Sequence, residues 1–298
     1  MSKLTIPGAV AGYLLGAVLL LAAYAKAIDP HGFADRLQDM SAPANLAYPG
    51  ALVVVAFEAG LGAALLGGAR HPVVLLASTA TFVMFVGIVA WQLARPDGTG
   101  VCGCFGQLFE RTPRQALYED VGFVALSGVA WLGAPRPGVL RWGPSLLGAG
   151  AGLALAVCAP SLPLDNQATA LAPGATVEDT QLDRIVPELR AGRHLVLLLD
   201  RSDPATRTRI PDLNERLNLP RGAIPVVGIA DDDPALAAAF LWAAGPAFEV
   251  HGAPPRMLRR LYRTLPRSAL FDGGRVLATW TGFPSDAALD TLARGGLP

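Results

Sequence analysis

The order of hydrophobic and polar residues divides this chain into two parts of different character. In the first part, long apolar stretches follow one another across short polar connections, whereas the second part alternates short apolar runs with polar segments. A helix needs about 20 mostly apolar residues to cross the hydrocarbon core of a bilayer. The pattern therefore predicts five membrane-spanning helices, at residues 9–28, 49–67, 72–93, 117–132 and 142–159.

Two of these stretches have features that complicate their interpretation as spans. Residues 9–28 contain Ala23-Tyr24-Ala25, which resembles the processing site of a cleaved signal peptide, but Lys3 alone makes a thin basic leader and four more apolar stretches follow. The fourth stretch is the weakest span because Glu119 and Asp120 lie near its start. We keep five spans as the prediction.

Composition supports the division. The 298 residues are 52% hydrophobic and only 16% charged, against about 25% charged in ordinary soluble domains. Residues 1–160 hold 9 Lys+Arg and 8 Asp+Glu, whereas residues 161–298 hold 15 and 16. The first part therefore implies membrane lipid as a partner, and the second reads as a soluble domain. With 24 charges of each sign, nothing favours nucleic acid as a partner.

The connections between the predicted spans indicate an orientation. With the N-terminus in the cytoplasm, the inner connections hold basic residues that have no acidic neighbour, namely Lys3, Arg70, Arg136 and Arg141. Basic residues concentrate on the cytoplasmic side of membrane proteins, but the outer connections also hold basic residues, diluted by seven acids: Lys26, Arg36, Arg95, Arg111 and Arg114. The Lys/Arg count therefore does not decide the orientation, and only the absence of acids from the inner connections indicates it. Five spans then place the C-terminal part outside the cytoplasmic membrane, so we expect a multi-pass protein with an extracytoplasmic domain.

After residues 161–175, which read as a linker, the pattern changes to alternating strands and helices. Apolar runs predict strands at 194–200, 223–230, 268–271 and 276–281, and helical composition occurs at 204–217, 234–244, 255–262 and 285–293. Asp272-Gly273-Gly274 joins the last two strands and is a strong hairpin signal. This order predicts an α/β sandwich with a mixed sheet.

The most specific chemical feature is Cys102-Gly103-Cys104-Phe105-Gly106, between the third and fourth predicted spans. Gly103 lets the backbone bend between the two thiols, and Gly106 frees the chain after them. A disulfide in so tight a ring is expected to be strained and oxidising. This favours a dithiol–disulfide pair that exchanges with another molecule. The alternatives are inert thiols, or half of a metal site completed by His31 and His71, although no full metal-ligand set is evident.

Three further residues are candidates for supporting roles. Lys26 and Glu58 lie close to apolar helix interior, where an unpaired charge is costly, so we expect that they can pair and set the charge near the cysteines. Lys26 alternatively extends its amine to the membrane surface. Cys158, at the end of the fifth span, either resolves a mixed disulfide or is a small buried hydrophobic residue. Three cysteines exclude a disulfide-stapled secreted scaffold.

At this point a resemblance is apparent. The residues Tyr24-Ala25-Lys26, Asp29-Pro30, Phe33, Pro49, Glu58 and the Cys102–Gly106 motif resemble the MauE/DoxX family of redox-associated membrane proteins, most narrowly its MauE branch, over about residues 5–135. The resemblance implies a four-helix membrane domain. It also implies a role in maturing the methylamine dehydrogenase small subunit through disulfide formation outside the membrane, with Cys102 and Cys104 as the redox pair.

The C-terminal part is similar to thioredoxin-like domains. Such domains carry a Cys-x-x-Cys pair at the start of the helix that follows the first core strand, where this chain has Asp203 and Thr206. Thr264-Leu265-Pro266 resembles the cis-proline segment that faces that pair. We therefore expect the scaffold without its thiol chemistry, with Asp203 as a helix cap and a partner chain docked beside Pro266.

These inferences divide the chain into a MauE/DoxX-like membrane domain (1–135), a fifth transmembrane helix (136–160), a linker (161–175) and a thioredoxin-like domain (176–298). Two functions remain open. One is a membrane thiol–disulfide oxidoreductase that oxidises an extracytoplasmic client and passes electrons to a quinone or a redox partner protein, although no cofactor motif is evident. The other is a non-catalytic scaffold or assembly chaperone. A transporter is less well supported because no repeat or broken-helix signal occurs.

Overall fold

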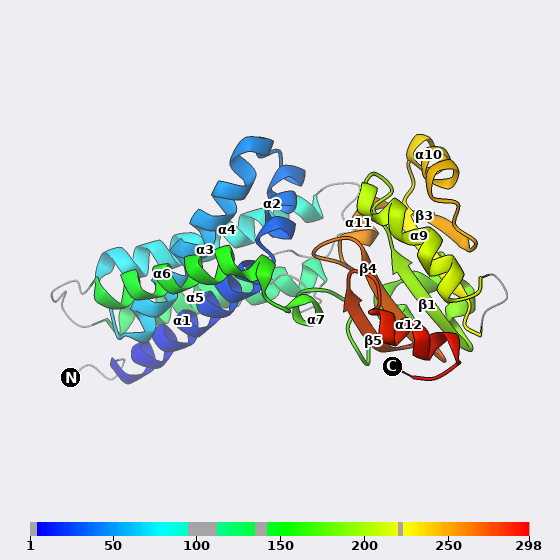
Figure 1. Ribbon diagram of the computed structural model, residues 1–298. Helices are drawn as coiled ribbons and strands as arrows, with labels where there is room; N and C mark the ends of the chain where they lie inside the picture. Colours follow the sequence, from blue (N-terminus) through cyan, green and yellow to red (C-terminus); the bar gives the residue numbers. More distant parts are fainter. Residues whose placement is uncertain (1–4, 95–111, 135–141, 220–222, 298) are drawn as a thin grey trace. The chain divides into compact units, whose positions relative to one another are not determined.

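The computed structural model describes residues 5–94, 112–134, 142–219 and 223–297. The chain forms two compact units, Met1–Leu162 and Pro163–Pro298, which are treated separately below. Figure 1 shows that the first is built from helices and the second around a sheet.

The first unit is a helical bundle that contains the predicted spans. Its described helices are α1 (Thr5–Ala27), α2 (Pro30–Asp39), α3 (Ala44–Leu66), α4 (Pro72–Leu93), α5 (Pro113–Leu132) and α6 (Gly143–Cys158), with a 3₁₀ turn at Ala159–Ser161. Among the described residues, α1, α3, α4 and Gly143–Ser161 are long and apolar enough to cross a membrane. The fourth predicted span, α5, falls outside that set, and it carries Arg114, Glu119 and Asp120. It nevertheless packs against α1 and α4 as part of the bundle.

The short helix α2 is an element that the hydrophobic pattern did not predict. Asp29 caps it by accepting a hydrogen bond from the Gly32 amide at 3.0 Å, and Pro30 occupies its first turn, where a missing N–H costs nothing. Its residues Phe33 and Ala34 pack against α3. The helix thus holds the segment after Lys26 close to α3.

Small residues allow the helices of this unit to approach one another closely. A Cβ atom added at Gly148 of α6 would lie 2.4 Å from the Cβ of Ala63 and 2.5 Å from the carbonyl oxygen of Ala59, both on α3. Gly16 of α1 and Gly62 of α3 face each other in the same way, each 2.8 Å from the other's carbonyl oxygen by that measure. Close backbone contact of this kind is typical of helix packing in lipid.

The second unit is a five-stranded mixed sheet in the order β3-β2-β1-β4-β5. Its strands are β1 (Arg193–Leu198), β2 (Val226–Asp231), β3 (Glu249–Ala253), β4 (Arg267–Asp272) and β5 (Arg275–Thr281). Its helices are α7 (Asp165–Ala168), α8 (Val177–Thr180), α9 (Pro204–Arg216), α10 (Pro234–Ala244), α11 (Pro255–Leu258) and α12 (Asp286–Ala293), and 3₁₀ turns occur at Leu182–Arg184 and Pro187–Arg190. Strands β1, β2 and β3 run parallel, whereas β4 is antiparallel to β1 and to β5.

The central strand β1 supplies side chains to a core on each face of this sheet. Leu195 and Leu197 pack in the core that includes residues of α9, α10 and α12, and Val196 and Leu198 pack in the core on the other face. This alternation follows from the two-residue period of a strand. The order β1–α9–β2, then the β4–β5 hairpin and α12, is that of a thioredoxin-like fold, as predicted. The pattern missed the edge strand β3.

Residues 161–175 differ from the linker that the sequence predicts, because most of this stretch is folded into the second unit. Leu171 is fully buried in its core. Arg267, at the start of β4, donates hydrogen bonds to the Thr169 hydroxyl at 2.7 Å and the Leu171 carbonyl oxygen at 2.6 Å. It also lies 3.7 Å from a carboxylate oxygen of Asp165. Composition alone misread this segment because its partners are about a hundred residues away.

Candidate functional site

The predicted redox motif, with Cys102, Gly103, Cys104 and Gly106, lies outside the residues that the structure describes. Its role stays a prediction from the sequence. The described candidates are the charged residues inside the bundle, Cys158, and the region of the soluble unit that surrounds Pro266.

Lys26 and Glu58 form an ion pair inside the helical bundle. Lys26 is in the last turn of α1, Glu58 lies in the middle of α3, and the amine nitrogen is 2.8 Å from Glu58 Oε2. Their side chains are 3% and 1% exposed. The expected pairing is therefore present, and the alternative in which the Lys26 amine reaches the membrane surface is wrong. Burial this deep is costly unless the two charges compensate each other.

Aromatic rings from two other helices complete the surroundings of the lysine. The Lys26 amine lies 5.5 Å from the ring centre of Phe33 on α2 and 5.3 Å from that of Phe85 on α4. Both distances suit a cation–π interaction, which strengthens when water is excluded. Glu58 Oε1 is buried and accepts no hydrogen bond from the described residues. Four helices thus converge on one positive charge, and its carboxylate partner keeps an oxygen with acceptor capacity.

Asp120 on α5 is a carboxylate whose burial the sequence analysis did not predict. It is 2% exposed, although the sequence analysis treated it only as a weakness of the fourth span. One turn further along α5, the ring of Phe123 packs 5.3 Å from that of Phe82 on α4, and Phe82 in turn contacts Phe85. The signal was available, since an acid in a long apolar stretch is a functional candidate by default.

Cys158 is the last residue of α6, and its side chain is exposed. The interpretation of this cysteine as a small buried hydrophobic residue is therefore wrong. Its other interpretation, a thiol that resolves a mixed disulfide, stays a prediction. The Ser161 hydroxyl donates to the Cys158 carbonyl oxygen at 2.7 Å, which fixes the backbone where α6 ends.

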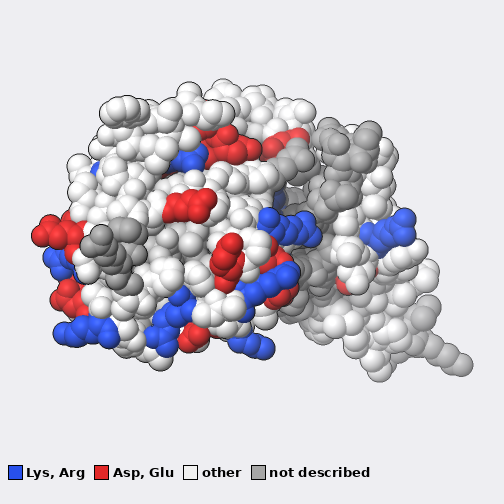
Figure 2. All heavy atoms as spheres, turned by 90° about the vertical axis from the view of Figure 1, so that its right-hand side faces the viewer, with Lys and Arg blue, Asp and Glu red and all other residues white. Residues whose placement is uncertain are grey.

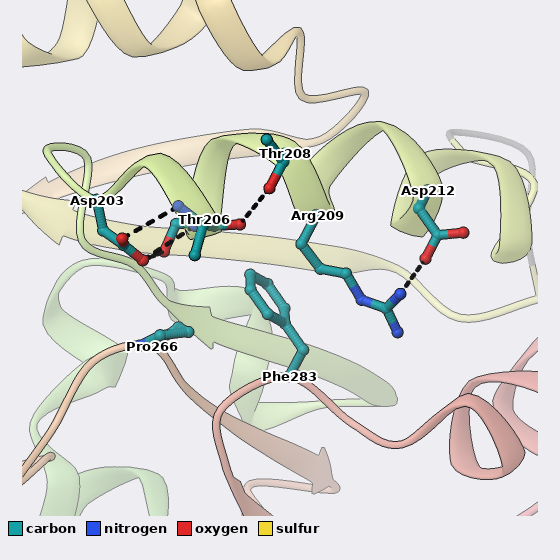
Figure 3. Close-up of a pocket in the computed structure, with 8 residues that line it drawn as sticks. Asp203, Thr206, Thr208, Arg209, Asp212, Pro266 and Phe283 are labelled. Atoms are coloured by element: carbon teal, nitrogen blue, oxygen red, sulfur yellow. Dashed lines mark hydrogen bonds and ion pairs between the residues drawn. The ribbon is translucent and has the colours of Figure 1, made fainter.

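In the soluble unit, Asp203 and Thr206 occupy the start of α9, where a thioredoxin-like domain would place its cysteines. The Asp203 carboxylate accepts hydrogen bonds from the amides of Ala205 and Thr206 at 3.1 and 3.0 Å and from the Thr206 hydroxyl at 2.9 Å (Figure 3). The Thr206 hydroxyl, followed by the two amides, lowers the pKa of Asp203. All three cysteines lie before residue 163. This helix start is a capped N-terminus with no thiol.

A cavity of about 360 Å³ lies beside this cap. Pro266, whose peptide bond with Leu265 is cis, forms one wall, and the Phe283 ring points towards α9 between Pro266 and Arg209 (Figure 3). The remaining lining residues come from α9 and its cap: Asp203, Ala205, Thr206, Thr208, Arg209 and Asp212. Arg209 is held by Asp212 and Asp286. The cavity therefore combines an apolar floor with fixed charges at its rim.

No group of three or more His, Cys, Asp or Glu side chains arranged to hold a metal ion occurs in the described ranges. What the described parts do define is a multi-pass membrane protein whose soluble unit is a thioredoxin-like domain. Residues 4–133 match the family described as methylamine utilisation protein MauE. The match ends before α6 and the soluble unit begin.

The other comparisons add less. The search of curated proteins gave no match. A solved structure described as a thiol:disulfide interchange protein, a thioredoxin family protein from Chlorobium tepidum TLS, is similar at 22% identity and a TM-score of 0.32. The similarity covers 38% of this chain and 84% of that one.

Proposed function

We propose that this protein is a membrane thiol–disulfide oxidoreductase that forms disulfides in an extracytoplasmic client. The observation that carries the proposal is the buried Lys26–Glu58 pair inside the part of the chain that matches the MauE family and also contains Cys102 and Cys104. A hydrophobic pair would fill the same space without the desolvation cost of two charges. Keeping charges at such a depth is typical of groups that act in chemistry.

The proposed reaction transfers two electrons. A client thiolate attacks one sulfur of the Cys102–Cys104 disulfide, forms a mixed disulfide and displaces the other sulfur as a thiolate. A second client thiolate then attacks the client sulfur of the mixed disulfide, which completes the client disulfide and leaves both cysteines reduced. The two client thiols lose two protons, and the reduced pair carries two electrons onward.

Lys26 and Glu58 support this step electrostatically in the proposal. A lysine ammonium close to a cysteine favours the thiolate, which is both the attacking and the leaving species. The acceptor capacity at Glu58 Oε1 suits a group that takes up a proton when a thiol ionises. Cys158 has the accessibility that a resolving thiol requires.

The pair must be reoxidised, and we propose a quinone, or else a redox partner protein, as the acceptor. A quinone dissolves in the bilayer and takes up two electrons and two protons as quinol, which balances the reaction. The thioredoxin-like domain would present the client at the cavity beside Pro266, outside the cytoplasmic membrane. The client to test first is the methylamine dehydrogenase small subunit, which the resemblance to the MauE branch implies.

The direct test replaces Cys102 or Cys104 by Ser and follows client thiols in membranes with an alkylating mass tag. We expect each replacement to abolish client oxidation, because neither can form the disulfide alone. Cys158→Ser is the matched control, and it should slow the reaction without abolishing it. Quinone-depleted membranes should stop after one turnover per protein and recover when quinone is added. Unchanged oxidation in both Ser variants would eliminate the proposal.

The second candidate function is a non-catalytic scaffold or assembly chaperone. It is favoured by the start of α9, where Asp203 and Thr206 bond to each other and no thiol is present. The redox state of Cys102 and Cys104 in native membranes separates the two functions. A pair that shifts between oxidised and reduced forms as client is supplied supports the enzyme. A pair that never changes supports the scaffold.

A further inference from the structure

The helix α10 of the soluble unit has a surface that does not suit a helix surrounded by water. Its sequence, Pro-Ala-Leu-Ala-Ala-Ala-Phe-Leu-Trp-Ala-Ala over Pro234–Ala244, contains no charged residue. The neighbouring α9, over Pro204–Arg216, has arginines, threonines and acids on its outer positions. Helices at a protein surface normally turn polar residues to the solvent.

The apolar side chains of α10 are turned outwards rather than into the core. Only Phe240 and Ala244 of this helix are buried, whereas Leu241 is 52% and Trp242 is 93% exposed. Trp242 is the most exposed large hydrophobic side chain in the described parts of the chain, more so than those on the membrane helices. In Figure 2, residues without charge (white) cover the upper edge of the molecule, and charged side chains lie below that edge.

The end of α10 is held firmly, so the exposure of Trp242 is not that of a frayed helix. Gly245 ends the helix in the left-handed conformation and donates its amide to the Leu241 carbonyl oxygen at 3.1 Å. The Asn214 side chain of α9 donates to the Gly245 carbonyl oxygen at 2.8 Å and accepts from the Ala247 amide at 3.1 Å. The indole is therefore presented by a fixed surface.

The connection to α6 keeps the soluble unit close to a bilayer. The membrane helix α6 ends at Cys158 and the soluble unit begins at Pro163. The intervening residues span about 18 Å at most when fully extended. A folded unit of this length has a radius of gyration of about 14 Å. The short connection therefore keeps this unit next to the membrane that anchors the chain, which is the nearest apolar phase.

The chemistry of the exposed face also suits lipid better than protein. Apart from the indole N–H, its side chains offer no hydrogen-bonding group. Tryptophan and leucine are typical of helices that lie in the membrane interface. Asp231, Asp232 and Asp233 come directly before α10, so its start must stay in water and away from anionic headgroups.

We propose that α10 is a membrane-docking helix that inserts Leu241 and Trp242 into the headgroup region of the bilayer that anchors the chain. The contact is apolar, and the acidic residues at the start of the helix disfavour negative lipid. It is therefore strongest on zwitterionic lipid and insensitive to salt. This inference does not depend on the redox function.

The test uses the full chain reconstituted into phosphatidylcholine vesicles, with and without bromine on the lipid chains. Bromine quenches a tryptophan only at contact range, and subtracting the emission of Trp242→Phe isolates the signal of Trp242. We expect brominated lipid to remove most of that signal. The matched control is the difference for Trp280→Phe, because Trp280 is partly buried against the core of the same unit and should keep its emission. Adding phosphatidylserine should weaken the quenching of Trp242, and adding salt to pure phosphatidylcholine vesicles should not change it.

Two results would overturn the proposal. If acrylamide in the water quenches the Trp242 signal and brominated lipid does not, the exposed side of α10 remains in water and does not contact the bilayer. A signal that neither reagent reaches would show that protein covers the helix, either a second copy or another partner. The exposed position of Trp242 makes the Phe variant safe for folding, and unchanged trypsin resistance of the soluble unit checks this.

Discussion

Each of the two units contains a deeply buried cation, Arg267 in the soluble unit and Lys26 in the membrane unit, and the surroundings of these two cations differ. In the soluble unit, the two terminal nitrogens of Arg267 donate to carbonyl, hydroxyl and amide oxygens of the segment 165–171 and face Asp165. In the membrane unit, Lys26 faces one carboxylate oxygen of Glu58 at 2.8 Å, the Ala22 carbonyl oxygen at 3.4 Å and two aromatic rings.

The difference distinguishes a charge that holds the fold together from a charge that can interact with a further group. Arg267 is surrounded by acceptors that tie two distant segments together, and burial lowers its pKa to about 10 while Asp165 opposes that shift. An arginine in such a setting stays charged at physiological pH and holds the fold. The Lys26–Glu58 pair lies on a more apolar background, with the rings of Phe33 and Phe85 beside the lysine amine. Such a pair can respond when a neighbouring charge appears.

The largest effect that tests this comparison is expected at Arg267. Arg267→Met removes the hydrogen bonds that hold the segment 165–171 and one of the two cations beside Asp165, the other being Arg263 at 3.8 Å, so the free energy of unfolding of the soluble unit should fall by about 3 kcal/mol. Urea unfolding of the full chain in detergent, read by trypsin cleavage of the soluble unit, measures it. Arg216→Met is the control, because Arg216 belongs to an exposed ion-pair cluster and should change stability little. Equal losses in the two variants would contradict a structural role for Arg267.

A smaller effect is expected at Lys26 and Glu58, with a signature of its own. Lys26→Met alone should destabilise the membrane unit by about 3 kcal/mol, because it leaves the Glu58 carboxylate buried and unpaired. The double variant Lys26→Met with Glu58→Gln should recover most of that loss but not client oxidation. Denaturation in detergent gives the stability, and the alkylation assay gives the activity. If the double variant oxidised client normally, the pair would be as purely structural as Arg267.

The smallest effect is expected at Asp203, an exposed carboxylate. Its folded pKa is below its unfolded value, so its stabilising contribution is complete above the unfolded pKa and is lost as the pH falls through the folded pKa. Asp203→Asn keeps a capping oxygen but cannot titrate. The variant should be slightly less stable than the parent chain at neutral pH, and the difference should begin to shrink below about pH 4 and vanish only below the lowered folded pKa. Unfolding curves across that range measure it, and a constant difference would disprove the assignment.

Much of the fold follows from local patterns that the sequence displays. The apolar stretches located the long helices, although α3 and α5 begin about four residues earlier than predicted because hydropathy alone marked their starts. Asp272-Gly273-Gly274 located the β4–β5 hairpin. Lys26 and Glu58 could be matched because two charges in apolar helices have few other ways to be compensated.

The features that could not be predicted depend on contacts between residues that are far apart in the sequence. The segment 161–175 has a linker's composition, and only the presence of Arg267 a hundred residues later makes it part of a core. The strand β3 is short and mixed in polarity, so it lacks the period that identifies an edge strand. The exposed face of α10 was equally hidden, because an apolar helix reads as buried until its neighbours are known.

The contacts of Arg267 connect the cavity wall to the segment 165–171. Arg267 follows Pro266 directly in the chain. Its side chain donates hydrogen bonds to the segment 165–171, which lies between α6 and the rest of the soluble unit in the sequence. Pro266, which forms one wall of the cavity, is therefore the immediate neighbour of the residue that anchors the segment 165–171. A change in the position of Pro266 on binding at the cavity would therefore act directly on the residue that holds the segment 165–171 in place.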